Sequence, residues 1–226
     1  MNSMNCKTFV CIAFATLLIV GCKATEIETS IKSFELRDAI EGKELSLKFD
    51  AQFTIFAENN EETKRQIVSI EGITEKYLPL EEFDVTTTDF GLRIQVEGKI
   101  PLVYSSEGTL SSSLQAPWVL IVSDNNDGGV LTGFSHKLKF IASPQFNAFS
   151  GELLKVNLML VPDKRQPLKI KFKNSGKDRL RIFTGAVEVG GESRVIFESK
   201  IDKKVSLTMK GGVYDNIAQV IYFSIE

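Results

Sequence analysis

His136 is the only histidine in the 226-residue chain, so any histidine-dependent proton chemistry must use it. It lies in register with Phe134, Leu138 and Phe140 on an alternating stretch, which predicts that its side chain faces the core or the edge of the core. The sequence contains no G-x-S-x-G motif that would present a serine nucleophile. We therefore expect no Ser-His-Asp triad, no catalytic residue and no enzymatic activity.

Residues that could bind a metal ion are also sparse. A zinc site needs three or four Cys, His or carboxylate ligands, and one histidine does not supply them. The run from Asp124 to Gly129 has the Asp and Asn content of a calcium loop, but the twelfth position is Ser135 rather than a closing Glu. A hairpin turn explains this run better, and we expect neither a metal ion nor a cofactor.

The charge balance excludes a global field for nucleic acid. The chain has 27 Lys and Arg residues against 29 Asp and Glu residues, a formal net charge of −2. Hydrophobic residues make up 43% of the chain, a composition typical of a globular protein with a sizeable core. We expect no nucleic-acid partner.

A concentrated group of basic residues lies between residues 168 and 183. Apolar and basic residues alternate there, and a three-residue loop at 175–177 would pair Phe172 with Leu180 and would set Lys171 opposite Arg181. Like charges directly opposite each other destabilise a strand pair, so this strip suggests a binding face for an acidic partner or for lipid headgroups. The candidate partner-binding residues are Lys169, Lys171, Lys173, Arg179, Arg181 and Phe183.

The alternative interpretation of this strip is a solvated face that acidic neighbours neutralise. Glu188, Glu198 and Asp202 are the nearest such residues along the chain. Strict alternation would turn Glu188 inward, so its share in the neutralisation requires a bulge, for which Gly185 is the candidate.

The N-terminus has the pattern of an export signal. An apolar run of 12 residues at 9–20 follows a polar start with one lysine, and this run is too short to span a bilayer. The residues at its end, Ile19-Val20-Gly21-Cys22, resemble the lipobox of bacterial lipoproteins. The resemblance implies that residues 1–21 are a cleaved signal peptide and that Cys22 carries acyl chains that bind the membrane.

The lipoprotein resemblance also implies a location. Lys23 stands where an Asp commonly retains a lipoprotein in the inner membrane, so we expect the outer membrane facing the periplasm, or the cell surface. Cys6 and Cys11 would leave with the signal peptide, so the mature protein would have no free thiol and no disulfide. Residues 22–30 would form a short tether that holds the folded part close to the bilayer.

The elements that follow the tether read mainly as strands. Period-two alternation over 45–57 and 92–102 predicts long strands with one wet face. Further strands are expected at 30–38, 67–73, 118–123, 130–142, 152–161, 168–174, 179–189, 193–201, 205–210 and 217–225. The one helix candidate, Thr74 to Phe83, is interrupted by Pro79.

This pattern predicts an all-β protein built of antiparallel β-sandwich modules. We expect two, an N-terminal domain at 31–145 and a C-terminal domain at 150–226, with a single larger sandwich as the alternative. The stretch 105–117 is expected to be a long loop and a candidate contact element.

These features favour a non-catalytic protein-binding module on the membrane. The length, short tether and all-β pattern resemble immunity lipoproteins that neutralise antibacterial phospholipase effectors, which implies a secreted lipase-type effector as the protein partner. The alternative is a structural or assembly lipoprotein of the envelope, such as an accessory subunit or an adhesin.

Overall fold

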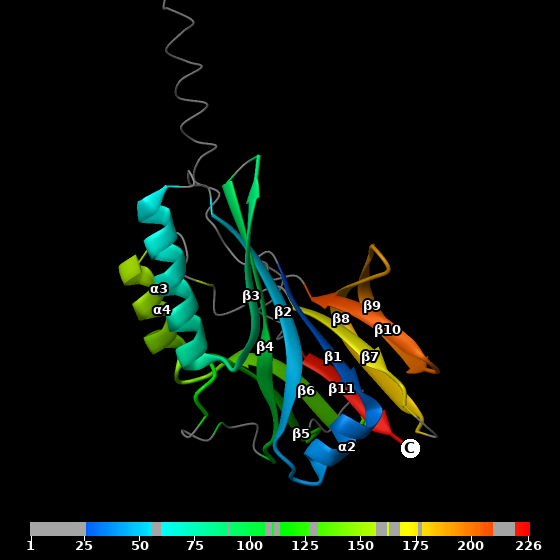
Figure 1. Ribbon diagram of the computed structural model, residues 1–226. Coiled ribbons are helices and arrows are strands. Elements are labelled where there is room, and N and C mark those ends of the chain that lie inside the picture. The colour runs from blue at the N-terminus through cyan, green and yellow to red at the C-terminus, as the bar shows by residue number, and fades with distance from the viewer. Residues whose placement is uncertain are drawn as a thin grey trace, which may run out of the picture.

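The computed structural model describes residues 26–55, 60–89, 91–106, 110, 114–126, 131–156, 162, 168–175, 178–209 and 220–226. In chain order (Figure 1) the described elements are β1 (Glu26–Lys32), α2 (Ser33–Ile40), β2 (Leu45–Ile55), α3 (Glu61–Tyr77), β3 (Leu80–Thr88), β4 (Gly91–Tyr104), β5 (Trp118–Asp124), β6 (His136–Ala142), α4 (Phe146–Val156), β7 (Leu168–Lys173), β8 (Leu180–Val189), β9 (Glu192–Ile201), β10 (Lys204–Met209) and β11 (Val220–Ile225). Within these ranges no helix is both long enough and apolar enough to cross a membrane.

Nine strands close into one barrel. Their order is β10, β7, β1, β2, β4, β5, β6, β11 and β8, and the ring closes where Leu207 and Thr208 of β10 pair with β8. Strand β3 pairs with β4 beside the ring, and β9 pairs with β8. The pairing is mixed, because β1 runs parallel to β7 and β4 runs parallel to β5.

The expected antiparallel β-sandwich modules are therefore wrong. Strands from before residue 145 and from after residue 150 contribute to the same closed barrel, and two of its pairings are parallel. A strand with one buried face satisfies a sandwich and a barrel equally, so alternation identified the strands but not their partners.

The long alternating strands themselves are confirmed. In β2 the side chains of Leu47, Phe49 and Ala51 are buried, and the residues between them face outward. In β4 the side chains of Ile94 and Val96 are likewise buried between outward-facing neighbours. The register pairs Ala51 with Val96 and Phe49 with Gly98, so both buried faces lie on the same side of the sheet. These side chains belong to the main hydrophobic core.

Three segments expected to contain strands form helices instead. The strand expected at 30–38 ends at Lys32 and gives way to α2, 67–73 lies within α3, and 152–156 belongs to α4. The buried residues of α3 are Thr63, Ile70, Thr74 and Tyr77, a helical spacing that two threonines make hard to see in the sequence.

Local signals fix the ends of α3. The side chain of Asn60 accepts a hydrogen bond of 2.9 Å from the backbone N–H of Thr63, which caps the helix at its N-terminus. The helix ends at Tyr77, directly before Leu78 and Pro79, because a residue that precedes proline is disfavoured in the helical region. Helices α3 and α4 lie side by side against one flank of β3 and β4 (Figure 1).

Strand β8 changes its inward phase part of the way along. Leu180, Ile182 and Thr184 are buried, but the next buried residue is Val187. Between them Ala186 has φ +49°, and the partner strand on one edge changes from β11 to β10. Val187 takes the inward position, so Glu188 beside it is only partly buried. For Glu188 to face the basic residues, the sequence required such a break in the alternation near Gly185.

The expected signal peptide, Cys22 and the first part of the tether lie outside the described residues. Strand β1 begins at Glu26, ahead of the strand expected near residue 31. It pairs with β2 on one edge and with β7 on the other, so the start of the described chain is built into the barrel.

Candidate functional site

Two of the three lysines of β7 share one carboxylate on β1. Lys169 Nζ lies 2.9 Å from Oε2 of Glu28, and Lys171 donates a hydrogen bond to the Oε1 atom of the same side chain. The parallel register places Glu28 beside Lys169 and creates this arrangement. Burial alone would raise the pKa of Glu28, but hydrogen bonds from Lys171 and Lys169 outweigh it and hold the pKa below its ordinary value.

The predicted hairpin between β7 and β8 does not form. Strand β7 pairs with β1 and with β10, and β10 also pairs with β8 and so separates the two strands. Lys171 is therefore opposite Ser30 and Ser206 rather than Arg181. The short loop at 175–177 suggested direct pairing, but alternation along each strand carries no signal for an intervening strand.

The remaining candidate residues occupy separate surroundings. Lys173 is exposed at the end of β7, and Arg179 precedes β8 and exchanges backbone hydrogen bonds with Glu226. Arg181 forms an ion pair with Glu198 on β9. The structure thus groups Lys169 with Lys171 through Glu28, and places Arg181 on a different strand with its own acidic partner.

Arg181 and Phe183, the last two candidate residues, both contact the ring of Phe134. The guanidinium of Arg181 lies 4.8 Å from the centroid of the Phe134 ring. Phe183 packs against the same ring at 5.8 Å between centroids, and against Tyr222 on β11 at 6.1 Å. Phe183 is therefore part of an aromatic cluster on the barrel wall.

His136 lies against the core, in agreement with its register. Its ring stacks on Phe223 at 5.4 Å between centroids, and its Nε2 is 3.7 Å from Oδ1 of Asp124. Burial lowers the pKa of His136 and the charge of Asp124 only partly opposes this effect. Tyr104 donates a hydrogen bond of 3.0 Å to Oδ2 of Asp124, which raises the pKa of the Tyr104 hydroxyl, so this tyrosine keeps its proton and orients the carboxylate.

The stretch 105–117 connects the parallel strands β4 and β5. Of its described residues, Leu110 and Leu114 pack against Val103, Val119 and Ile121 on the outer side of the barrel wall. The described part of the expected contact loop thus covers an apolar patch.

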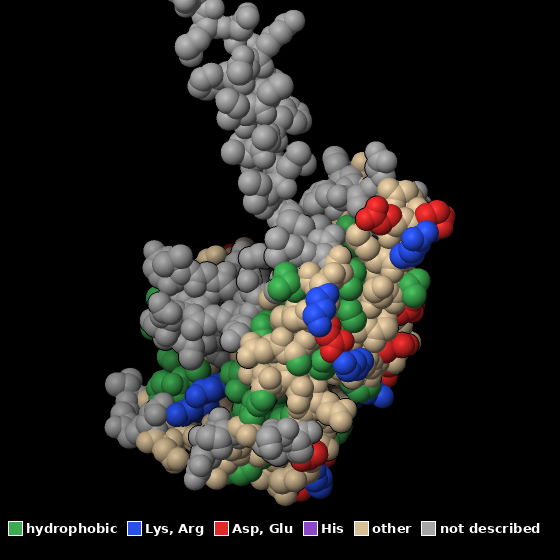
Figure 2. Space-filling model, turned by 90° about the vertical axis from the view of Figure 1, so that its left-hand side faces the viewer, with side chains coloured by type: hydrophobic (Ala, Val, Ile, Leu, Met, Phe, Trp, Pro, Cys, Tyr) green, Lys and Arg blue, Asp and Glu red, His purple; other side chains and the backbone are tan. Residues whose placement is uncertain are grey.

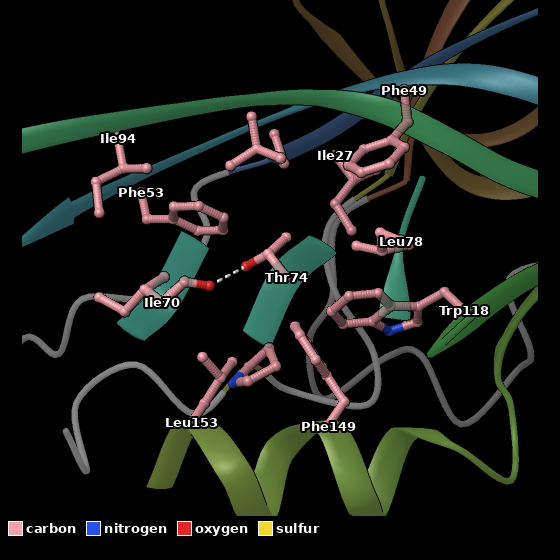
Figure 3. A pocket seen from close by; sticks show the side chains of 13 residues that line it. Ile27, Phe49, Phe53, Ile70, Thr74, Leu78, Ile94, Trp118, Phe149 and Leu153 are labelled. Atoms are coloured by element: carbon pink, nitrogen blue, oxygen red, sulfur yellow. Dashed lines mark hydrogen bonds between the residues drawn. The ribbon is translucent and has the colours of Figure 1, made fainter. Parts of the chain in front are cut away.

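An apolar cavity lies between the barrel and the helix pair α3 and α4. Counted with the open space at its mouth, it has a volume of about 610 Å³. Its lining residues are Ile27, Phe49, Ala51, Phe53, Ile70, Thr74, Leu78, Ile94, Val96, Trp118, Phe149, Leu153 and Pro162. Figure 3 shows Phe149 and Leu153 of α4 facing the side chains of β2 and β4 across this space.

The polar groups around the cavity are few. Thr74 is the one lining residue with a hydroxyl, and it donates a hydrogen bond of 2.7 Å to the carbonyl of Ile70 within α3, drawn as a dashed line in Figure 3. The ring of Trp118 makes edge contacts with Phe146 and Phe149 at 5.4 and 5.8 Å between centroids. Its indole N–H is buried and has no hydrogen-bond partner among the described residues, so the wall is almost entirely apolar with one free donor.

Polar contacts clamp the two helices at one side of the cavity. Oε1 of Glu152 on α4 accepts hydrogen bonds from Lys76 Nζ at 2.5 Å and from the Tyr77 hydroxyl at 2.7 Å. The bond from Lys76 is the main cause that lowers the pKa of Glu152, and the bond to Glu152 is the main cause that raises the pKa of Tyr77. In Figure 2, which shows the flank that carries α3 and α4, acidic and basic side chains are interspersed rather than gathered by sign.

Strand β9 presents a hydrophobic edge. Among the described strands it pairs only with β8, and Val195 and Ile196 in its middle are 84% and 64% exposed. Two adjacent residues of a strand point to opposite faces, so the β8–β9 hairpin is open on both faces at this point. The sequence offered one signal for it, the run of apolar residues from Val195 to Phe197 between charged neighbours.

Neither a protein-family model nor a curated protein matches this chain. Within the described residues no group of three or more His, Cys, Asp or Glu side chains is arranged to hold a metal ion. The fold and the geometry define a mixed, closed β-barrel that carries an apolar cavity beneath two helices and a hydrophobic strand edge.

Proposed function

We propose that the mature protein is a lipid-anchored, non-catalytic protein-binding module of the bacterial envelope. The anchor would be acyl chains on Cys22, and the I-V-G-C motif after the apolar run supports this assignment. Only four peptide steps separate Cys22 from the start of β1 at Glu26, a reach of about 14 Å when extended. A barrel tied in this way would stay at the membrane surface.

The observation that carries the binding function is the exposed edge of β9. A long strand edge with hydrophobic residues invites pairing with another chain, and natural proteins usually blunt such edges with charge, proline or a covering element. Here Val195 and Ile196 remain exposed in the middle of the strand. A partner that adds an extended strand would gain backbone hydrogen bonds from the edge and side-chain contacts from these two residues.

The basic residues on β7 and β8 play a smaller part in this proposal. Lys169 and Lys171 are joined to Glu28, and Arg181 is joined to Glu198, so the charge available to an acidic partner is reduced on both strands. We assign them to the rim of an interface, where charges influence the rate of association more than the affinity.

The more specific form of the proposal is immunity against a secreted lipase-type effector. Its support is the length of the chain and the short tether, because the all-β pattern it also drew on is interrupted by three helices and the expected sandwich is a barrel. It predicts a one-to-one complex with an effector encoded beside this protein, and protection of cells that express the pair. Neighbouring genes for envelope components and a permeability defect on deletion would instead identify an assembly lipoprotein.

The test uses a matched pair of variants and the product of the adjacent gene. Ile196→Glu places a charge on the β9 edge, and Val68→Glu places one on α3, where the side chain is 68% exposed. We expect Ile196→Glu to weaken the complex at least tenfold in a titration, and Val68→Glu to leave it unchanged. Equal affinities for the two variants would remove β9 as the interface.

The anchor is tested separately. Mass spectrometry of the protein extracted from membranes should show acyl chains on Cys22 as the first residue, and Cys22→Ser should release the protein from the membrane fraction or leave it with its leader. An unmodified Cys22 on a protein found free in solution would contradict the lipid anchor without affecting the β9 interface.

A further inference from the structure

We propose that the cavity beneath α3 and α4 is a binding site for one unbranched hydrocarbon chain. This site is separate from the β9 edge, and it can be tested whether or not a protein partner is found there. The chain could be supplied by a membrane lipid or free fatty acid, or by the acyl group on Cys22, and the experiment below distinguishes these sources.

The chemistry of the wall selects the ligand. Twelve of the thirteen lining residues are apolar, and the hydroxyl of Thr74 is already bonded to the carbonyl of Ile70. A wall of this kind favours apolar ligands, because water finds few hydrogen-bond partners on it. A ligand with a polar body would lose its hydrogen bonds to water, and the described lining residues could return at most one, from the buried N–H of Trp118, which has no partner in the described part of the chain.

The construction of the cavity lets it admit a chain. The cavity proper measures only about 40 Å³, and the 610 Å³ includes open space at its mouth, so a hydrocarbon chain enters fully only when the helices move away from the strands. One wall consists of barrel strands held on both edges, and the other consists of two helices joined to each other through Glu152. The helices can move apart from the strands without breaking backbone pairing, so the wall that adjusts to the ligand is the helical one.

The position of the cavity brings hydrocarbon within reach. Ile27 lines it, and five peptide steps, or about 17 Å when extended, separate this residue from Cys22. If Cys22 is acylated, both its own chains and the chains of the surrounding bilayer lie close to the cavity. The hydrocarbon-binding site rests on the wall alone, so an unmodified Cys22 would remove only one of the two sources.

The cavity contains its own reporter. Trp118 is the only tryptophan in the chain, lines the cavity and is 6% exposed. Dibrominated stearic acid should quench its fluorescence on binding, because bromine quenches indole only near contact. We would use residues 22–226 with Cys22→Ser, which contain every described element of the fold.

Matched variants on α4 locate the ligand. Leu153→Phe fills the cavity, whereas Leu154→Phe makes the same change at the next residue, which is 47% exposed. We expect Leu153→Phe to raise the concentration of brominated acid that gives half of the maximal quenching at least tenfold. We expect Leu154→Phe to leave this concentration unchanged. Ala51→Leu, which fills the cavity from β2, provides a second test if Leu153→Phe fails to fold.

The acylated protein in phosphatidylcholine vesicles identifies the source. If added brominated acid quenches Trp118 in the acylated protein, the cavity takes external lipid. If the acid quenches Trp118 only in the Cys22→Ser protein, the acyl chain on Cys22 occupies the cavity in the acylated protein. No quenching of Trp118 in either protein would overturn the hydrocarbon site, as would equal quenching of the Leu153→Phe and Leu154→Phe variants.

Discussion

Replacing Gly98 by alanine tests the packing between the barrel and the cavity. Gly98 lies on β4, and a Cβ atom there would be 2.8 Å from the carbonyl oxygen of Pro79 and 2.9 Å from Cε1 of Phe49. The first neighbour is backbone and the second is a buried ring, so the clash cannot be relieved by moving the end of a flexible side chain. Inserting one methyl group into such a site costs about 1–3 kcal/mol.

Gly72→Ala is the matched control. Gly72 lies in the middle of α3, and a Cβ atom there would meet nothing within 4 Å. The same substitution should therefore stabilise the protein by about 0.5–1 kcal/mol through helix propensity. The two variants differ from the wild type by the same methyl group and should change the free energy of unfolding in opposite directions.

The assay is urea denaturation followed by the fluorescence of the single tryptophan, with thermal unfolding as a second measurement. For a chain of this size each kcal/mol corresponds to roughly 2–4 °C in Tm. Gly98→Ala should unfold at lower urea concentration and lower temperature than the wild type, and Gly72→Ala at higher values. If Gly98→Ala matches the wild type while Gly72→Ala behaves as expected, Phe49 and Pro79 do not enclose Gly98 as described.

Three further predictions use the same denaturation assay. Glu28→Gln should lower the free energy of unfolding by about 1–2 kcal/mol at pH 7, because two lysines lose their charged partner. The lowered pKa of Glu28 makes its contribution present above the ordinary value of 4.5 and lost as pH falls through the folded-state pKa, so the wild-type advantage should disappear in acid. His136→Phe should keep the stacking on the core while removing the titrating group. Because burial lowers the pKa of His136, the wild type should lose more stability than this variant as pH falls from 6.5 through the folded-state pKa, and equal losses would contradict it. Asn60→Ala should cost about 1 kcal/mol by removing the cap on the N–H of Thr63, and an unchanged midpoint would show that α3 does not depend on this cap.

The sequence predicted the long strands well because each is specified by its own alternation. The buried faces of β2 and β4 follow directly from period-two patterns such as Leu47, Phe49 and Ala51. Closure of the barrel depends instead on pairings between distant residues, such as Ile27 with Leu168. The sequence of neither strand specifies the other as its partner. A sandwich and a barrel therefore could not be distinguished from the alternation of apolar and polar residues.

The helices were missed for different reasons, apart from residues 74–77, which the helix candidate at 74–83 shares with α3. In α3 the inward positions include Thr63 and Thr74 beside Ile70, which weakens the helical period and leaves a short apolar run that resembles a strand. In α4 the spacing of Phe146, Phe149 and Leu153 is helical, but the neighbouring Pro and Gly residues suggested a break. Without the helices the cavity could not be foreseen, since they form its second wall.

For the basic residues, prediction from the sequence was limited in a different way. Their outward positions on β7 and β8 were predictable from alternation, but their neutralisation by Glu28 was not, because that residue lies on β1. Glu198, in contrast, was among the acidic neighbours considered from the sequence and does pair with Arg181. Nearby acidic residues could be found in the sequence, whereas one brought in by parallel pairing could not.

The parallel contact between β1 and β7 also constrains how the chain can fold. The first strand finds its second neighbour only when residues 168–173 are present, so the relative contact order is high and refolding should be slow for a protein of this size. A nascent or truncated chain that stops before β7 would expose a bare row of amide and carbonyl groups along β1. Aggregation through that row is the expected fate of incomplete chains.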